Sequence, residues 1–231
     1  MSYTPYTTSP TEVLQQQSIM TRVYAWMMAG LLATGAIAMF VASTPLGMAL
    51  ISNQLLFFGI IIGELALVWY LSARISKIAA STATGLFLAY ATLNGITLSI
   101  IFLAYTSSSI ASTFFVTGAT FGVMSVYGYT TRRDLSRMGN ILFMALIGFL
   151  IASVVNLFLR SELIYWITTY AGILIFVGLT AWDTQKIKQM SMNSSGEESQ
   201  VQRIAILGAL MLYLDFINLF LLLLRIMGNR R

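Results

Sequence analysis

The chain has 231 residues, of which 58% are hydrophobic and 9% are charged, and its formal net charge is +5. Soluble domains carry about 25% charged residues, so a chain with so few charges could not cover a water-exposed surface. It contains no cysteine and no histidine, which excludes metal centres built on those ligands and catalysis by Ser-His-Asp or Cys-His sets. Its basic residues lie between apolar runs and form no dense patch, which argues against nucleic-acid binding and for anchoring at a membrane surface.

Residues 1–21 are polar and lack the apolar segment of a cleaved signal peptide, so we expect a short, mostly disordered cytoplasmic tail there. The remainder, 22–231, is predicted to form one transmembrane domain with the lipid bilayer as its solvent. Each of its apolar runs can cross about 30 Å of hydrocarbon at about 1.5 Å rise per residue. The seven runs are residues 22–43, 54–73, 79–105, 110–131, 138–159, 163–182 and 204–224. Such runs must be helical in lipid, because every backbone amide needs an internal partner, so the fold class is an all-α membrane protein.

The segments between the runs alternate between uncharged and basic. With the tail inside the cell, nine Lys and Arg lie on the cytoplasmic side and four outside, which favours a cytoplasmic N-terminus. If 204–224 turned back as a re-entrant hairpin, its following arginines would join the cytoplasm and the count would become twelve against one. We favour a full crossing, because this run is unbroken and has no internal half-breaks.

Two aspartates lie in or beside the apolar runs. Asp215 lies in the middle of the last run, where an aspartate costs about 2.5–3.5 kcal/mol on insertion scales. Gly208 and Asn218 share its helix face, which predicts that this face packs inside the bundle. Asp183 closes the sixth run, and Thr180 shares its face. The two polar edges, on consecutive antiparallel helices, are therefore predicted to meet.

Two carboxylates in contact inside a membrane cannot both be ionised cheaply, so Asp183 and Asp215 are predicted to share a proton near neutral pH. This gives a pH switch that needs no histidine. Arg74, at the cytoplasmic end of the second run, is predicted to latch the pair while Asp183 is ionised. Calcium would compete for the same oxygens, but a tight site takes six to eight of them, so only weak, transient coordination is expected. Glu64, also in the second run, either bonds a neighbouring helix or adds a further polar group near the pair.

The depth of the two aspartates sets a condition on the last helix. If both helices start at the interface, Asp183 lies near the surface and Asp215 about 16 Å below it. The last helix must therefore begin well before Arg203. Ser195 and Glu198 match an S-x-x-E capping box, which would start the helix two turns before Arg203.

Three stretches of the chain resemble the Bax inhibitor-1 family, also called the transmembrane Bax inhibitor motif family. They are ATLNGITLSIIF (91–102), GLTAWDTQKIK (178–188) and ALMLYLDFINLFLLLLRI (209–226). The resemblance covers nearly the whole chain after the tail and is strongest to bacterial members. It implies a seven-helix bundle with the last helix central, in a bacterial inner membrane. It also implies a pH-sensitive calcium leak channel, with the sensor at Asp183 and Asp215 and the latch at Arg74.

Two other functions stay open at this point. One bacterial branch of the family is linked to a membrane-bound ATP-dependent protease, so a non-transporting regulator of such a protease is an alternative. In that case residues 1–21 would be the segment that the protease engages. An intramembrane aspartyl protease also carries two aspartates on adjacent helices. It uses Gly-x-Gly-Asp and Tyr-Asp, whereas the flanks here are YLD and AWD and no Pro-Ala-Leu motif follows. We therefore expect a non-enzymatic protein with no cofactor beyond transient Ca²⁺.

Overall fold

The computed structural model describes residues 10–231, and over that range the chain forms eight α-helices and no β-strand. They are α1 (Pro10–Ala42), α2 (Pro45–Ser52), α3 (Gln54–Arg74), α4 (Ala80–Ala104), α5 (Ser107–Thr130), α6 (Ser136–Leu159), α7 (Glu162–Met192) and α8 (Glu198–Met227). All except the short α2 are long and apolar enough to cross a membrane, so seven spans are present in this part of the chain. The predicted all-α membrane fold is confirmed.

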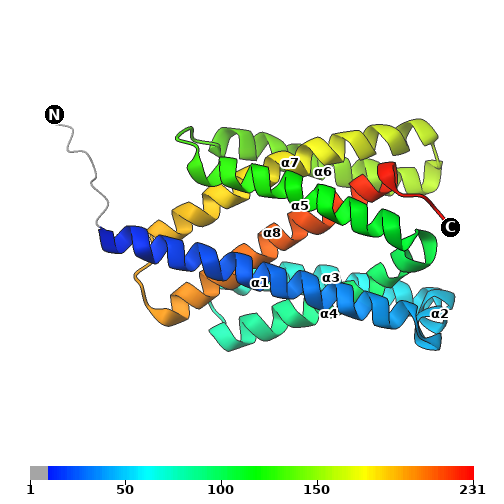
Figure 1. The fold of residues 1–231 in the computed structure, drawn as a ribbon, viewed down its shortest axis with the longest axis horizontal. Helices are drawn as coiled ribbons and strands as arrows, with labels where there is room; N and C mark the ends of the chain where they lie inside the picture. Colours follow the sequence, from blue (N-terminus) through cyan, green and yellow to red (C-terminus); the bar gives the residue numbers. More distant parts are fainter. Residues whose placement is uncertain (1–9) are drawn as a thin grey trace.

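Helix α8 lies between two groups of helices, α1, α3 and α4 on one side and α5, α6 and α7 on the other (Figure 1). It packs mainly against α1, α4, α5 and α7, whereas α3 packs on α4 and α6 packs on α7. In the most apolar stretch of α8, 67% of the residues are buried, against 0% in α6. The last helix is therefore central, as predicted, and α3 and α6 form the outer, lipid-facing edges.

The sequence of α8 explains its central place. A helix that is apolar on all sides is stable only when it is surrounded, and buried residues follow one another along nearly the whole of α8. Tyr213 is fully buried, and its ring packs edge-to-face on Phe87 and Tyr90 at centroid distances of 5.9 and 5.7 Å. Its hydroxyl lies 2.7 Å from Thr34 Oγ1, so burial leaves this polar atom with a partner. The contact fixes α8 against α1 and α4.

Helix α1 begins at Pro10, so the segment 1–21, expected to be mostly disordered, is helical in its second half. Residues 1–9 lie outside the described part of the chain. Gln16 and Ile19 are buried, at 8% and 0% exposure. The polar first turns of α1 are ordered because they pack on the bundle, a tertiary contact that composition alone does not indicate.

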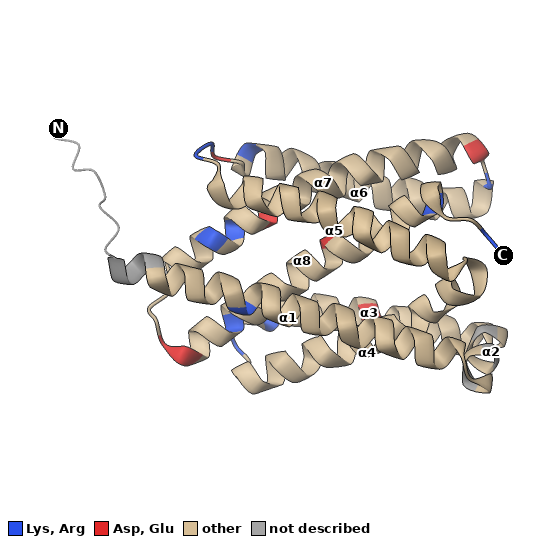
Figure 2. Cartoon of the chain, in the orientation of Figure 1, with Lys and Arg blue, Asp and Glu red and all other residues tan. Residues whose placement is uncertain are grey.

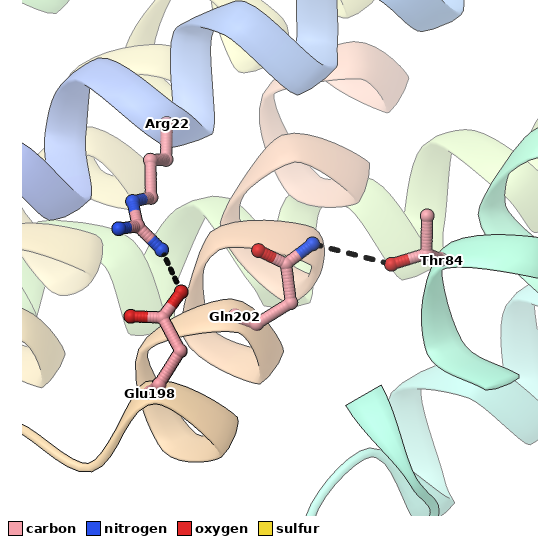
Figure 3. Close-up of polar contacts among 4 residues, drawn as sticks. All are labelled: Arg22, Thr84, Glu198 and Gln202. Carbon is pink, nitrogen blue, oxygen red and sulfur yellow. Dashed lines mark hydrogen bonds and ion pairs between the residues drawn. The ribbon is translucent and has the colours of Figure 1, made fainter. Parts of the chain in front are cut away.

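The start of α8 is tied to both neighbours from the first helix group (Figure 3). Arg22 of α1 forms an ion pair with Glu198. Gln202 Nε2 donates a hydrogen bond of 3.2 Å to Thr84 Oγ1 of α4. These contacts hold the N-terminal end of the central helix between α1 and α4.

The C-terminal residues lie at the end of the bundle opposite the start of α1 (Figure 1). Asn229 and Arg231 pair with the α4–α5 link, through Thr106 N donating to Asn229 O at 3.1 Å and Arg231 N donating to Ala104 O at 3.0 Å. The last apolar run therefore crosses the bundle fully and does not turn back. Lys and Arg gather mainly at the end where α1 begins, and fewer lie at the opposite end (Figure 2).

Candidate functional site

Helix α7 extends well past the predicted end of the sixth run at residue 182. Its buried side continues at helical spacing through Asp183, Ile187 and Ser191 to the end at Met192. Asp183 consequently lies about 14 Å before the end of its helix, rather than at that end. This difference moves Asp183 away from the helix end and toward the depth of Asp215.

Helix α8 starts early, as the depth argument requires, but by a different cap. The N-cap residue is Glu197 and the helix begins at Glu198. The predicted capping box at Ser195 is wrong, because the backbone N–H and the hydroxyl of Ser195 both donate to the Gln200 side chain instead. Asp215 lies about 25 Å along the helix from this start.

The carboxyl groups of Asp183 and Asp215 meet across the α7–α8 interface, within hydrogen-bond reach of each other. Both side chains are buried, at 8% and 4% exposure. Asp183 Oδ1 and Asp215 Oδ2 have no hydrogen-bond partner within residues 10–231. The structure thus brings together two acidic groups that are far apart in the sequence. Because a carboxylate oxygen can only accept, the two groups can hydrogen-bond to each other only when one of them carries a proton.

Glycines allow the two helices to approach closely on either side of the pair. A Cβ added at Gly208 would lie 3.1 Å from the Ile187 side chain, and one at Gly172 would lie 2.8 Å from Leu222. These contacts run in opposite directions along the two helices, as antiparallel packing requires. The close approach expected at Gly208 is confirmed, and it brings α7 near enough for the carboxyl groups to touch.

Helix α7 is also fixed from the α5 side. Ser125 Oγ lies 3.3 Å from Thr184 Oγ1, and Thr184 directly follows Asp183 in the sequence. Gln185 Oε1 accepts from Leu135 N, and its Nε2 donates to Arg133 O, both at 2.8 Å. The buried amide of Gln185 therefore holds the α5–α6 link on the helix that carries Asp183. The sequence alone did not single out Gln185, because an amide side chain beside two lysines is typical of a residue at the membrane surface.

Lys186 lies one turn beyond Asp183 on the same helix, and its charge acts on that carboxylate. Its Nζ lies 4.9 Å from the ring centroid of Trp182. In the sequence, the i, i+3 spacing of Asp183 and Lys186 indicates that the two side chains share a helix face. Arg74 is exposed at the end of α3 and forms no ion pair with either aspartate in the described chain. It lies on an outer helix that packs on α4, so the latch stays a prediction that this conformation does not display.

The further polar residues expected near the pair are engaged elsewhere. Thr180 and Asn218 each donate to a backbone carbonyl of their own helix at 2.8 Å. Glu64 accepts from Thr97 Oγ1 of α4 at 2.7 Å, which is the interhelical hydrogen bond that was one of its two predicted roles. In the described chain, none of these three bonds to Asp183 or Asp215.

The donor set of the pair limits what it can bind. Within residues 10–231 no group of three or more His, Cys, Asp or Glu side chains is placed to hold a metal ion. Two carboxylates are far short of the six to eight oxygens of a tight calcium site. The pair is therefore suited to a proton or to a briefly held cation, and not to a resident metal.

Seven apolar helices around a buried carboxylate pair define a multi-pass membrane protein with a polar site in its core. A sequence profile described as "Inhibitor of apoptosis-promoting Bax1" matches residues 16–231, and the chain belongs to this Bax inhibitor-1 family. It is 54% identical over 217 residues to the inner membrane protein YbhL of Escherichia coli K12, with 93% of each chain covered.

Two further relatives span much of the chain. Protein RP147 of Rickettsia prowazekii is 45% identical over 215 residues, which cover 92% of this chain and 89% of that protein. Membrane protein SpyM3_0260 of Streptococcus pyogenes is 40% identical over 180 residues, which cover 78% and 77%. The family resemblance drawn from the sequence is therefore confirmed.

Proposed function

We propose that this protein is a cation leak pathway, carrying Ca²⁺, whose opening depends on the protonation of Asp183 and Asp215. The observation that supports the proposal is the contact between these two buried carboxyl groups. Inside the bundle they are stable together when they share one proton. Loss of that proton leaves two like charges in contact in a medium of low dielectric, which favours separation of α7 from α8. The pair then acts as a pH switch in a chain without histidine.

The same oxygens suit the proposed cargo. Carboxylate oxygen is the ligand that Ca²⁺ prefers, and Asp183 and Asp215 place such oxygens together inside the bundle. Because both side chains are buried, Ca²⁺ reaches them only when α7 and α8 separate. With so few ligands, binding is weak and release is fast, as passage requires. Protonation and Ca²⁺ compete for the same atoms, which couples flux to pH.

The proposal is tested with the full-length protein reconstituted into liposomes that contain a fluorescent Ca²⁺ indicator. We expect Ca²⁺ entry above that of protein-free liposomes, and a rate that changes between about pH 5 and about pH 9, the range over which perturbed carboxyl groups titrate. A rate equal to that of protein-free liposomes throughout this range would overturn the proposal. A non-transporting regulator of a membrane-bound ATP-dependent protease would then be the surviving alternative.

Replacing Lys186 with glutamine is expected to move the midpoint of the flux–pH curve upward by roughly one pH unit, because a nearby cation favours the ionised form of a carboxyl group. The measurement is the same flux assay over a series of pH values. Lys77→Gln is the matched control, since Lys77 is exposed on the link between α3 and α4, two helices that do not pack on α7. Equal midpoints for Lys186→Gln and Lys77→Gln would show that Lys186 does not act on the pair.

A further inference from the structure

A groove of about 670 Å³ opens between α1 and α5, in the half of the bundle where α1 begins. Its floor is Phe216 of the central helix α8, next to Asp215. Its walls include Tyr24, Met27 and Met28 from α1 and Gly118 and Gly122 from α5. The two walls belong to the two helix groups that lie on either side of α8 (Figure 1).

Two glycines keep this groove open. A Cβ added at Gly118 or Gly122 would meet no atom within 4 Å. One turn apart on α5, they remove side chains from the wall that faces α1. Neither glycine is therefore in close contact with another helix, and the two leave open space on the surface of α5.

The length of the groove matches one leaflet of a bilayer. Its α1 wall runs from Gln17 to Met28, which is about 16 Å along the helix axis and about half of a 30 Å hydrocarbon core. Between spanning helices at this depth, an open apolar groove is in contact with acyl chains. Its size and position therefore fit a lipid tail from the leaflet on this side.

The end of the groove nearest the membrane surface is polar, and a basic side chain contacts one of its lining residues. Gln17, Thr21 and Tyr129 line it. Lys188 Nζ lies 5.0 Å from the Tyr129 ring centroid and donates to Tyr129 O at 2.8 Å. Lys188 has no carboxylate partner among the described residues, where the one ion pair is Arg22–Glu198. A cation that has no carboxylate partner and contacts the polar end of an apolar groove is complementary to a lipid that carries a negative headgroup.

We propose that the α1–α5 groove binds one acyl chain of an anionic phospholipid, with the phosphate of its headgroup at Lys188. The site is separate from the proposed ion pathway, and lipid binding does not depend on ion flux. Two of its lining residues adjoin the segments that carry the carboxylate pair, because Phe216 follows Asp215 in α8 and Ser125, on the α5 wall, contacts Thr184.

The experiment uses full-length protein in bilayer nanodiscs that contain phosphatidylglycerol with a photoreactive diazirine on one acyl chain. After irradiation, mass spectrometry of peptides locates the label. We expect the label to concentrate on α1, α5 and Phe216, above its level on the lipid-facing residues of α3 and α6. An even distribution of the label around the bundle would overturn the proposal.

Filling the groove provides the first variant. Gly118→Leu with Gly122→Leu is expected to reduce groove labelling to the level of α3, without lowering the unfolding temperature, since both side chains enter open space. Gly59→Leu with Gly63→Leu is the matched control, because these α3 glycines have the same spacing and a Cβ there also meets nothing within 4 Å. Groove labelling that survives the Gly118 and Gly122 changes contradicts the proposal.

Removing the cation provides the second variant. Lys188→Gln is expected to lower the preference for phosphatidylglycerol over phosphatidylcholine by about fivefold, which corresponds to about 1 kcal/mol for one basic side chain near the membrane surface. The position of the label should stay the same, because the acyl chain is held by the apolar walls. Equal labelling of the wild-type groove by the two lipids shows that no anionic headgroup is selected and overturns the assignment to Lys188.

Discussion

Replacing Asp215 with asparagine is expected to abolish the pH dependence of Ca²⁺ flux through the protein in liposomes. Asparagine has nearly the shape of aspartate but cannot ionise, so the pair can no longer gain or lose its shared proton. The contact between α7 and α8 should persist, since the amide can donate to Asp183. The measurement is the rate of Ca²⁺ entry from about pH 5 to about pH 9, at equal protein content, for the wild type and the variant.

The control for this experiment is Asp134→Asn. Asp134 lies in the α5–α6 link, where its side chain accepts from Ser136 N at 2.9 Å, and it does not contact the pair. This variant should keep the wild-type pH curve, whereas Asp183→Asn should lose it as Asp215→Asn does. A wild-type curve in Asp215→Asn would exclude the pair as the pH sensor.

Replacing Gly128 with leucine is expected to cause the largest loss of stability among single substitutions in the α5–α7 interface. A Cβ at this position would lie 2.1 Å from the carbonyl oxygen of Ala181, a backbone atom that cannot turn aside. Ala181 precedes Asp183 by two residues, so the displacement acts on the segment that positions the pair. Overpacking of this kind costs about 1–3 kcal/mol or more, which should lower the thermal unfolding temperature in detergent by several degrees.

Gly118→Leu is the matched comparison for Gly128→Leu. Both are α5 glycines, but a side chain at Gly118 enters open space. Gly118→Leu should unfold within about 0.5 kcal/mol of the wild type, as surface substitutions do. If the two variants unfold at the same temperature, α5 and α7 are not packed through Gly128 as described.

The spans and the two aspartates could be predicted because their signals are local. An apolar run long enough to cross a bilayer is stable there only as a helix, and a carboxylate inside such a helix must face the interior of the bundle or a polar partner. The ends of helices depend instead on contacts between distant segments. Helix α7 continues to Met192 because Ile187 and Ser191 are buried, and α1 begins at Pro10 because Gln16 packs on the bundle.

The neighbours of the pair were harder to predict than the pair itself. Arg74 and Lys186 both lie at the end of the bundle where α1 begins, and charge alone does not distinguish them as partners of Asp183. Helix packing decides between them, since α3 packs on α4 whereas Lys186 shares α7 with Asp183. The role of Gln185 also depends on the fold of the α5–α6 link, which no spacing in the sequence specifies.

The most direct test of the account is infrared difference spectroscopy of the protein in lipid, titrated across the pH range of flux. A protonated carboxyl group has a C=O stretch that is distinct from the bands of a carboxylate. If the two groups share one proton, a single carboxyl band should lose intensity as the pH rises, and both Asp183→Asn and Asp215→Asn should remove or shift that band. A band that Asp183→Asn leaves unchanged would contradict a shared proton, because it would belong to one aspartate alone.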